Sequence, residues 1–397
     1  MDRYRKIELA LATRDRPTPA DPLDAAIDRL RSLALCGLKR MYCREQGLFA
    51  FRARRDSNGA LILEGSSPRY TAIALIGLAS EQPEVSVEVL GEGEAARACR
   101  RLIDGVEQVS NLGDAALTLW AALAMKDEAA SKALDRLVEL RPVEGAHPTV
   151  EVAWCLAALM VDATLRQEQS DLARQIADRL IRSFVPRSGV FRHWPVDVRG
   201  SVLRGHVACF ADLVYPIQAL AHYHAATGDE AAIQAARRCA EQMCAMQGAE
   251  GQWWWHWDLR TGRVIEPYPV YAVHQDAMAP MALLAIQEVT GQTYRSAIER
   301  GVRWLLDPME LRGPTGEATC SLLDESLGVI WRKVARHEPG KFSRTAQALA
   351  SRIHRGLRVP GLGWVFRPGR IDYECRPYHL GWLLLAWSNR KLLRDES

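Results

Sequence analysis

The chain has 397 residues, of which 48% are hydrophobic and 25% charged, and its formal net charge is +3. These values are ordinary for a globular protein with a large core. So small a net charge, with basic residues scattered among acids, argues against a nucleic-acid partner. No uncharged apolar run reaches the roughly 18 residues of a membrane-spanning helix, so no membrane span is predicted.

The N-terminal stretch MDRYRKIELALATRDRP is interrupted by charges and lacks the apolar core of a signal peptide. The nine cysteines are odd in number, widely spaced and without a CxxC pair. This pattern is typical of reduced thiols, so we predict a cytoplasmic location. The sequence holds no indication of an oligomeric state.

Residues 1–21 are broken by prolines and charges, and we interpret them as an N-terminal lead-in to one domain over 22–397. Helical spacing of apolar residues predicts a helix over 22–41. Strand-like runs follow around Asn58-Gly59, which marks a hairpin turn, and then a short apolar helix from Ser67.

Amphipathic and more apolar helical stretches alternate along the rest of the chain. The amphipathic stretches are 94–109, 127–140, 165–184, 229–247, 292–306 and 342–356. The more apolar ones are 113–125, 148–162, 211–225, 275–288, 323–336 and 377–389. Amphipathic helices bury one face, whereas helices that are apolar all round are enclosed by others. We therefore predict an all-α fold, a single α/α toroid of about six to seven helical hairpins.

Internal repetition supports this prediction. Segments that begin at Gly47, Gly189, Gly251 and Gly363 each place a glycine and an aromatic strand pair directly before an apolar helix. We expect these segments to form short β-hairpins on one rim of the toroid. Residues at the joints would then face a common opening.

The motif Gln247-x-x-x-Gly251-x-Trp253 at a predicted helix end resembles the QW repeat of the terpenoid cyclase and protein prenyltransferase toroids. The helix that begins HQDAMAPMALL resembles the one that carries the acidic motif of class II terpene cyclases. This resemblance implies an isoprenoid substrate, with aromatic rings that stabilise carbocations. In this chain, however, the acidic motif falls on 273–276, where Gln275 replaces the proton-donating acid, and no DDxxD run is present.

The helix alternation and the helix-end motif also resemble the (α/α) barrels of carbohydrate-active enzymes. That resemblance implies a polyhydroxylated substrate in the central cavity. It supports the fold more directly than an activity, because one fold hosts many functions.

The densest candidate site lies between Gln247 and Gln287, where four tryptophans occur within five residues. In a strand of period two, Trp253, Trp255 and Trp257 share one face. Three rings on a face would suit stacking on sugar rings, and packing on the barrel is the structural alternative.

Ionisable residues follow the tryptophans at the joint before the next helix. Glu266 stands with Tyr268 and Tyr271, and aromatic surroundings would raise its pKa and suit a general acid. An ion pair with Arg204 or Arg376 is the structural alternative for Glu266. Further candidates on this joint are His274 and Asp276, and a carboxylate in the first helical turn can also act as a cap.

Other repeats supply candidates of the same kind. The second repeat contributes Arg204, His206, Asp212 and Tyr215, where Asp212 has the same capping alternative as Asp276. The last repeat contributes Glu374, Arg376, Tyr378 and His379, next to a helix that we expect to begin at Pro377. Asp324 begins the predicted helix over 323–336, where an acid also suits the helix dipole.

We expect an enzyme that acts on a carbohydrate or related polyhydroxylated substrate by carboxylate acid/base chemistry, as a hydrolase, lyase or epimerase. Glycoside cleavage needs two carboxylates across the scissile bond, and Glu266 and Asp276 are the preferred pair, with Glu374 and Asp212 as substitutes. Tyr378, His379 and Arg376 would instead support proton abstraction beside a uronate.

Two alternatives stay open, a terpenoid cyclase-like or prenyltransferase-like enzyme and a non-catalytic toroid that binds a glycan or a protein. Histidines are spread over separate elements, and glycine-rich phosphate-binding motifs are absent. No metal and no other cofactor is therefore predicted, and the expected partner is a small-molecule or oligosaccharide substrate.

Overall fold

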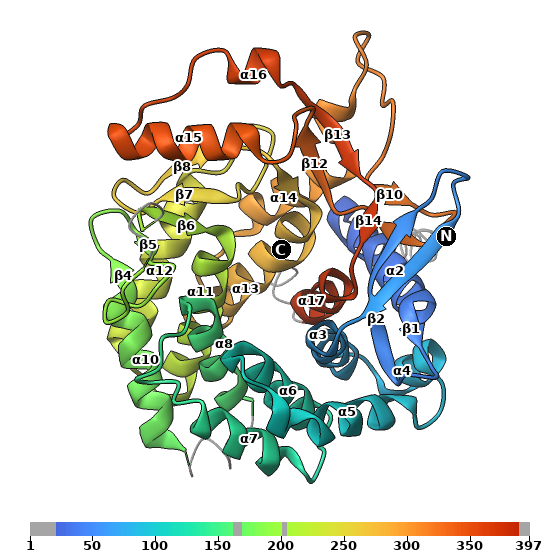
Figure 1. The fold of residues 1–397 in the computed structure, drawn as a ribbon, viewed down its shortest axis with the longest axis vertical. Coiled ribbons are helices and arrows are strands. Elements are labelled where there is room, and N and C mark those ends of the chain that lie inside the picture. The colour runs from blue at the N-terminus through green and yellow to red at the C-terminus, as the bar shows by residue number, and fades with distance from the viewer. Residues whose placement is uncertain (1–20, 162–168, 201–204, 389–397) are drawn as a thin grey trace, which may run out of the picture.

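A computed structural model describes residues 21–161, 169–200 and 205–388 of the chain. Nearly all of the predicted lead-in, 1–21, thus lies outside the described residues. Within the described part, six helices form a closed inner ring in which each packs against the next (Figure 1). They are α3 (Pro68–Ala79), α6 (Leu112–Ala124), α8 (Thr149–Leu159), α11 (Phe210–Thr227), α13 (Ala279–Thr290) and α17 (Pro377–Ser388).

A second layer of helices surrounds this ring. Its members are α2 (Pro22–Met41), α5 (Glu94–Asp104), α7 (Ala130–Glu139), α10 (Ser170–Ser183), α12 (Glu230–Ala245) and α14 (Arg295–Leu306). Three shorter or peripheral helices are α4 (Pro83–Leu90), α15 (Phe342–Ile353) and α16 (Leu362–Val365). The predicted α/α toroid is confirmed.

The two layers differ in burial as their sequences require. The inner helix α8 buries nine of its eleven residues, all except Val150 and Glu151, since neighbours enclose it on every side. The outer helix α5 buries only one face, formed by Ala98, Cys99, Leu102 and Ile103. An apolar stripe of this width seats a helix against a core while its other face meets water.

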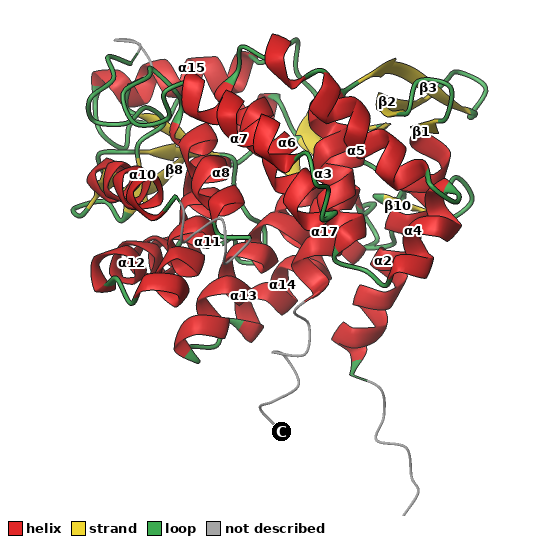
Figure 2. Cartoon of the chain, turned by 90° about the horizontal axis from the view of Figure 1, so that it is seen from below, coloured by secondary structure: helices red, strands yellow, loops and turns green. Residues whose placement is uncertain are grey.

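Short antiparallel strands lie toward one rim of the ring, as Figure 2 shows from the side. One sheet joins β1 (Tyr42–Cys43), β2 (Leu48–Arg55), β3 (Leu61–Ser66) and β14 (Glu374–Cys375). A second joins β6 (Val207–Cys209), β7 (His256–Asp258) and β8 (Arg263–Glu266), and a third joins β9 (Val270–Tyr271), β12 (Lys333–Arg336) and β13 (Pro368–Asp372). Two-stranded pairs are β4 (Phe184–Val185) with β5 (Val190–Phe191), and β10 (Leu323–Asp324) with β11 (Val329–Ile330).

The predicted inner helix over 323–336 is wrong. These residues form β10, β11 and β12, and a turn at Gly328 with φ +61° separates the first two strands. Left-handed backbone at a glycine ends a helical run, and the β-branched pair Val329-Ile330 favours a strand. The described ring therefore has six inner helices, and β12 carries charged side chains to its opening.

The last repeat also differs in part from the prediction. Gly363, Trp364 and Val365 lie in the short helix α16, and the strand begins only at Pro368. Pro377 is the first residue of α17, as predicted.

Two glycines allow α3 and α17 to touch where the ring closes. A Cβ atom on Gly77 would lie 2.2 Å from the carbonyl oxygen of Gly381, and one on Gly381 would lie 2.4 Å from that of Ile73. The backbones are thus in direct contact, and no larger residue fits at either position.

Candidate functional site

A cavity of about 640 Å³ opens at the centre of the ring. Its aromatic lining comes mainly from the inner helices and comprises Tyr70, Trp154, Tyr215, Trp255, Tyr271, Tyr378 and Trp382. Its cationic lining comprises Arg69, Arg332, Lys333, Arg336, Lys341, Arg344, Arg370 and Arg376. Glu338 is the one carboxylate among the described lining residues, and His274 is the one histidine. We call this space the central cavity.

A larger groove of about 980 Å³ runs beside it between β2 and α5 and shares Arg69 and Tyr70 with the central cavity. Its wall lacks a histidine among the described residues. We therefore place the candidate site in the central cavity, where aromatic rings, cations and an imidazole meet.

His274 is positioned by a break in the regular helix geometry. Residues His274–Met278 form one π-helical turn that precedes α13. The widened turn seats the His274 ring parallel to Trp255, at 5.4 Å between ring centroids and 2° between planes. Such π-turns are common at functional sites because they redirect one side chain without ending the helix.

His274 is a neutral imidazole in this setting. Burial lowers its pKa to about 3, because little water remains to solvate the charged form. Nδ1 lies 3.4 Å from the carbonyl oxygen of Trp253, which can only accept, so Nδ1 carries the proton. The lone pair is then on Nε2.

Asp276 and His379 form a pair behind the lining. Nε2 of His379 is 2.8 Å from one carboxylate oxygen of Asp276 and 2.9 Å from the other. Both side chains are buried, and burial raises the pKa of Asp276. Asp276 therefore joins α17 to the turn before α13 instead of capping its own helix.

The other predicted catalytic carboxylates are engaged in ion pairs or caps. Glu266 accepts a hydrogen bond from Nε of Arg336 at 2.7 Å, whereas the predicted alternative partner Arg376 pairs with Glu374. Glu374 accepts from Nε of Arg376 and lies 3.5 Å from Arg332. Among the described residues, no two carboxylates face each other across the central cavity.

Of the three tryptophans that we expected to stack on a sugar ring, only Trp255 lines the central cavity. Trp253 and Trp257 are fully buried, and only three residues, His256–Asp258, form the strand. Neither ring lines the central cavity, so the structure does not support a stacking role for Trp253 and Trp257 there. Trp255 does line the central cavity, and it also lines a neighbouring one.

Several predicted binding residues lie elsewhere. His206 contacts Ser351 at 3.0 Å, Tyr268 donates to Glu310 at 2.8 Å, and Asp324 accepts from the Leu327 amide at 3.1 Å. None of these three predicted residues lines the central cavity. Arg204 lies outside the described residues. The predicted Tyr215, Tyr271, Arg376 and Tyr378 do line the cavity.

Gln247 of the QW-like motif is structural. Its side-chain amide donates to the carbonyl oxygens of Gly251 and Ala297, both at 2.9 Å, and its oxygen accepts from Arg300 at 2.6 Å. The glutamine therefore ties the end of α12 to α14, which accounts for the motif without an activity.

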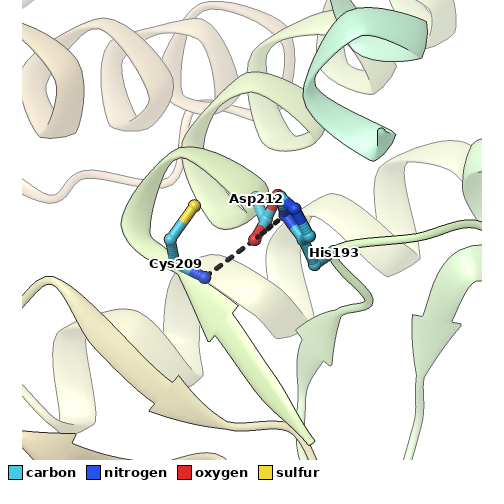
Figure 3. Close-up of side chains that lie close together, drawn as sticks. All are labelled: His193, Cys209 and Asp212. Atoms are coloured by element: carbon cyan, nitrogen blue, oxygen red, sulfur yellow. Dashed lines mark hydrogen bonds and ion pairs between the residues drawn. The ribbon is translucent and has the colours of Figure 1, made fainter. Parts of the chain in front are cut away.

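Asp212 belongs to a different cluster, with His193 and Cys209 (Figure 3). Its carboxylate accepts from the Cys209 amide at 2.7 Å and lies 3.1 Å from Nδ1 of His193, so it caps α11. The ligand atoms of the three residues lie within 4.8 Å of one another, which could hold a divalent cation with thiolate, imidazole and carboxylate ligands. Burial raises the pKa of the Cys209 thiol, which disfavours the thiolate that a metal needs.

The sequence reasoning missed the basic residues of β12 and its neighbours. The stretch Lys333–Arg336 reads Lys-Val-Ala-Arg, in which charged and apolar residues do not alternate, so its sequence carries no clear strand signal.

No protein-family model matches the sequence, and no curated protein matches it. Solved structures do resemble the chain. A cellobiose 2-epimerase from Bacillus thermoamylovorans aligns with a TM-score of 0.58 at 12% identity, over 92% of this chain and 100% of that one. A possible GH105-family member from Salmonella enterica aligns at 0.55 and 10% identity, over 96% and 97%.

A sugar epimerase from a ruminal bacterium aligns at 0.54 and 10% identity, over 92% of this chain and 98% of that one. At these identities the similarity establishes the α/α-toroid fold alone. Separately, none of the described helices combines the length and apolar character of a membrane span.

Proposed function

We propose that the protein is an enzyme that moves a proton at a carbon next to the carbonyl group of a sugar, as an epimerase, isomerase or lyase does. The observation that carries the proposal is the neutral His274 in the wall of the central cavity. Its Nδ1 proton is held by Trp253, which leaves the Nε2 lone pair for a substrate.

The chemistry follows from the groups around His274. Nε2 would take the proton from carbon, and the electron pair would move toward the carbonyl oxygen to give an enediolate. Arg332 and Arg376 line the same cavity and would stabilise the negative oxygen. Return of the proton to the other face of the same carbon would give the epimer. Protonation of the former carbonyl carbon, with a proton passing between the two oxygens, would give the isomer, and loss of a leaving group from the next carbon would give the lyase product.

Tyr378 is a candidate proton donor in the same cavity. Burial raises its pKa to about 12, so the hydroxyl group stays protonated at neutral pH. The names of the similar solved structures, two sugar epimerases among them, favour a saccharide as the substrate.

Hydrolysis by a carboxylate pair is less well supported, because Glu338 is the one described carboxylate in the lining. An isoprenoid substrate is also less well supported, since the strongly cationic wall would repel the carbocation that isoprenoid cyclisation forms. We also propose a cytoplasmic location, because all nine cysteines are free.

Hydrogen exchange tests the proposal. The protein is incubated in D₂O with glucose, mannose, cellobiose, glucuronate and galacturonate, and NMR follows deuterium at the carbon next to the carbonyl. The wild type should exchange at least one sugar, and His274→Gln should slow the exchange by about 10² or more. His206→Gln is the matched control, a buried histidine outside the central cavity.

The two variants should have melting temperatures close enough to show that both are folded. Exchange by His274→Gln at the wild-type rate would refute the role of His274. Release of a reducing sugar without deuterium incorporation would favour hydrolysis, and binding without either reaction would favour the non-catalytic toroid.

A further inference from the structure

The central cavity has an excess of positive charge. Among the described lining residues, five of the eight cations form ion pairs with carboxylates. Arg69 pairs with Asp114, Arg332 and Lys333 with Asp372, Arg336 with Glu266, and Arg376 with Glu374. The described part of the chain shows no ion pair for Lys341, Arg344 or Arg370.

These three cations come from one side of the opening. Lys341 and Arg344 lie at the start of α15, and Arg370 lies on β13, and both elements border the same part of the ring in Figure 1. Glu338, the one lining carboxylate, accepts from the Ser343 amide at 2.5 Å and so offsets only part of this charge. We call Lys341, Arg344 and Arg370 the basic rim.

The cations deeper in the cavity are held in place by aromatic rings. Arg336 lies 4.8 Å from the centroid of Tyr268, Arg332 lies 5.4 Å from that of Tyr271, and Arg376 donates to the Tyr70 hydroxyl at 2.7 Å. Nε of Arg332 is buried and has no hydrogen-bond partner among the described residues. Groups fixed in this way lose little side-chain entropy when a ligand binds.

Like charges gathered in a concave wall repel one another, and low-dielectric surroundings strengthen the field that they create. A neutral sugar would leave this repulsion in place. An anionic group would relieve it and would gain charge-assisted hydrogen bonds from guanidinium groups. Aromatic rings of the same lining, such as Trp154 and Trp255, would meanwhile cover the apolar face of a sugar ring.

We infer that the ligand of the central cavity is a saccharide with a negatively charged substituent, a carboxylate, sulfate or phosphate, which the basic rim binds. The inference rests on the proposed function only in placing the reactive carbon near His274. A bound anion would also raise the pKa of His274, which would make His274 a stronger base in the complex.

Calorimetric titration tests the inference. The probes are glucose, glucuronate, glucose 6-sulfate, glucose 6-phosphate and inorganic phosphate, each at 50 and 500 mM NaCl. We expect at least one anionic sugar to bind at least tenfold more tightly than glucose, and to lose affinity in high salt. Which of the three anionic sugars binds best identifies the charged group.

Variants locate the effect. Arg344→Gln should weaken binding of the anionic sugar about tenfold and leave the affinity for glucose unchanged. Arg367→Gln is the matched control, because Arg367 is an exposed arginine three residues before Arg370 and lies outside the cavity lining. A second rim variant, Arg370→Gln, keeps the test valid if Arg344→Gln does not fold.

Two results would overturn the inference. One is equal affinity for glucose and for all anionic sugars, without salt dependence. The other is inorganic phosphate that binds as tightly as glucose 6-phosphate, because the cavity would then not recognise a saccharide. Salt-dependent binding of an anionic sugar without hydrogen exchange would refute the proposed proton transfer but support the inference, and exchange of neutral sugars alone would do the reverse.

Discussion

His379 and Asp276 are 103 positions apart in the chain, yet Nε2 of His379 contacts both carboxylate oxygens of Asp276, at 2.8 and 2.9 Å. The contact joins the last inner helix to the π-turn that carries His274. It therefore holds the candidate base in place from behind while leaving the cavity wall to other residues.

Removal of the carboxylate should destabilise the protein. Asp276→Ala leaves the buried imidazole of His379 without its partner, so the free energy of unfolding should fall by about 3 kcal/mol. Urea denaturation of Asp276→Ala, His379→Leu and the double variant measures the coupling between the residues. A double variant that costs the sum of the single ones would show that the two side chains do not interact.

The pH dependence of stability should reflect the buried His274. Its pKa is about 3 in the folded protein, against 6.5 for a histidine exposed to water. Between these values the unfolded chain binds the additional proton, so stability is lost as the pH falls below 6.5, by about 1.4 kcal/mol per pH unit.

Urea midpoints at pH 7.5, 6.5 and 5.5 for wild type and His274→Gln isolate this effect. Asp276 has a raised pKa and acts in the opposite sense, but it is present in both proteins and cancels in the difference. Parallel curves for the two proteins would contradict the low pKa of His274.

Adjacent tryptophans should respond differently to the same substitution. Trp253→Ala empties a fully buried site and should cost about 4 kcal/mol of stability. Trp255→Ala removes a half-buried ring from the cavity wall, so it should cost roughly half as much or less and weaken saccharide binding by about three- to tenfold. Thermal melts and titration distinguish the two, and equal losses of stability would contradict the assignment.

The contact between α3 and α17 should not tolerate a methyl group. Gly381→Ala gains about 1 kcal/mol of helix propensity but forces a clash at 2.4 Å, so we expect a net loss of about 2 kcal/mol or more. Gly105→Ala is the control, since its φ is −90° and the nearest atom to an added Cβ lies at 3.6 Å. A stable Gly381→Ala would mean that the helices are farther apart than described.

Glu266→Gln separates catalysis from structure. A residue used only as an acid could be changed without loss of stability, whereas the ion pair with Arg336 predicts a loss of about 2 kcal/mol. The double variant Glu266→Gln/Arg336→Met should recover part of that loss. An unchanged melting temperature for Glu266→Gln would return this residue to the list of catalytic candidates.

The sequence sufficed for the helix alternation, because burial on one face or on all faces imposes its own periodicity on each helix. It also predicted that His274, Tyr378 and Arg376 approach one opening, which follows from their place at the joints before inner helices. The strands over 323–336 were not predicted, because a short apolar run fits a buried helix and a strand equally well. The turn at Gly328 is the feature that separates the strands and rules out a continuous helix.

The partners of the carboxylates could not be predicted. Glu266 and Arg336 are 70 positions apart, and nothing in local spacing indicates that β8 and β12 bring them together. The positive charge of the cavity was hidden for the same reason. Its cations are spread over 69–376, and the local sequence does not distinguish any of them from a surface charge.

The ring closes through α17, which lies between α3 and α13 and supplies Tyr378 and Trp382 to the cavity. During synthesis on the ribosome, the inner ring therefore has a gap between α3 and α13 until residue 388 has left the exit tunnel. Until then the apolar sides of α3 and α13 have no neighbour in the gap, and the central cavity lacks part of its lining. The central cavity is thus completed only when α17 takes its place in the ring.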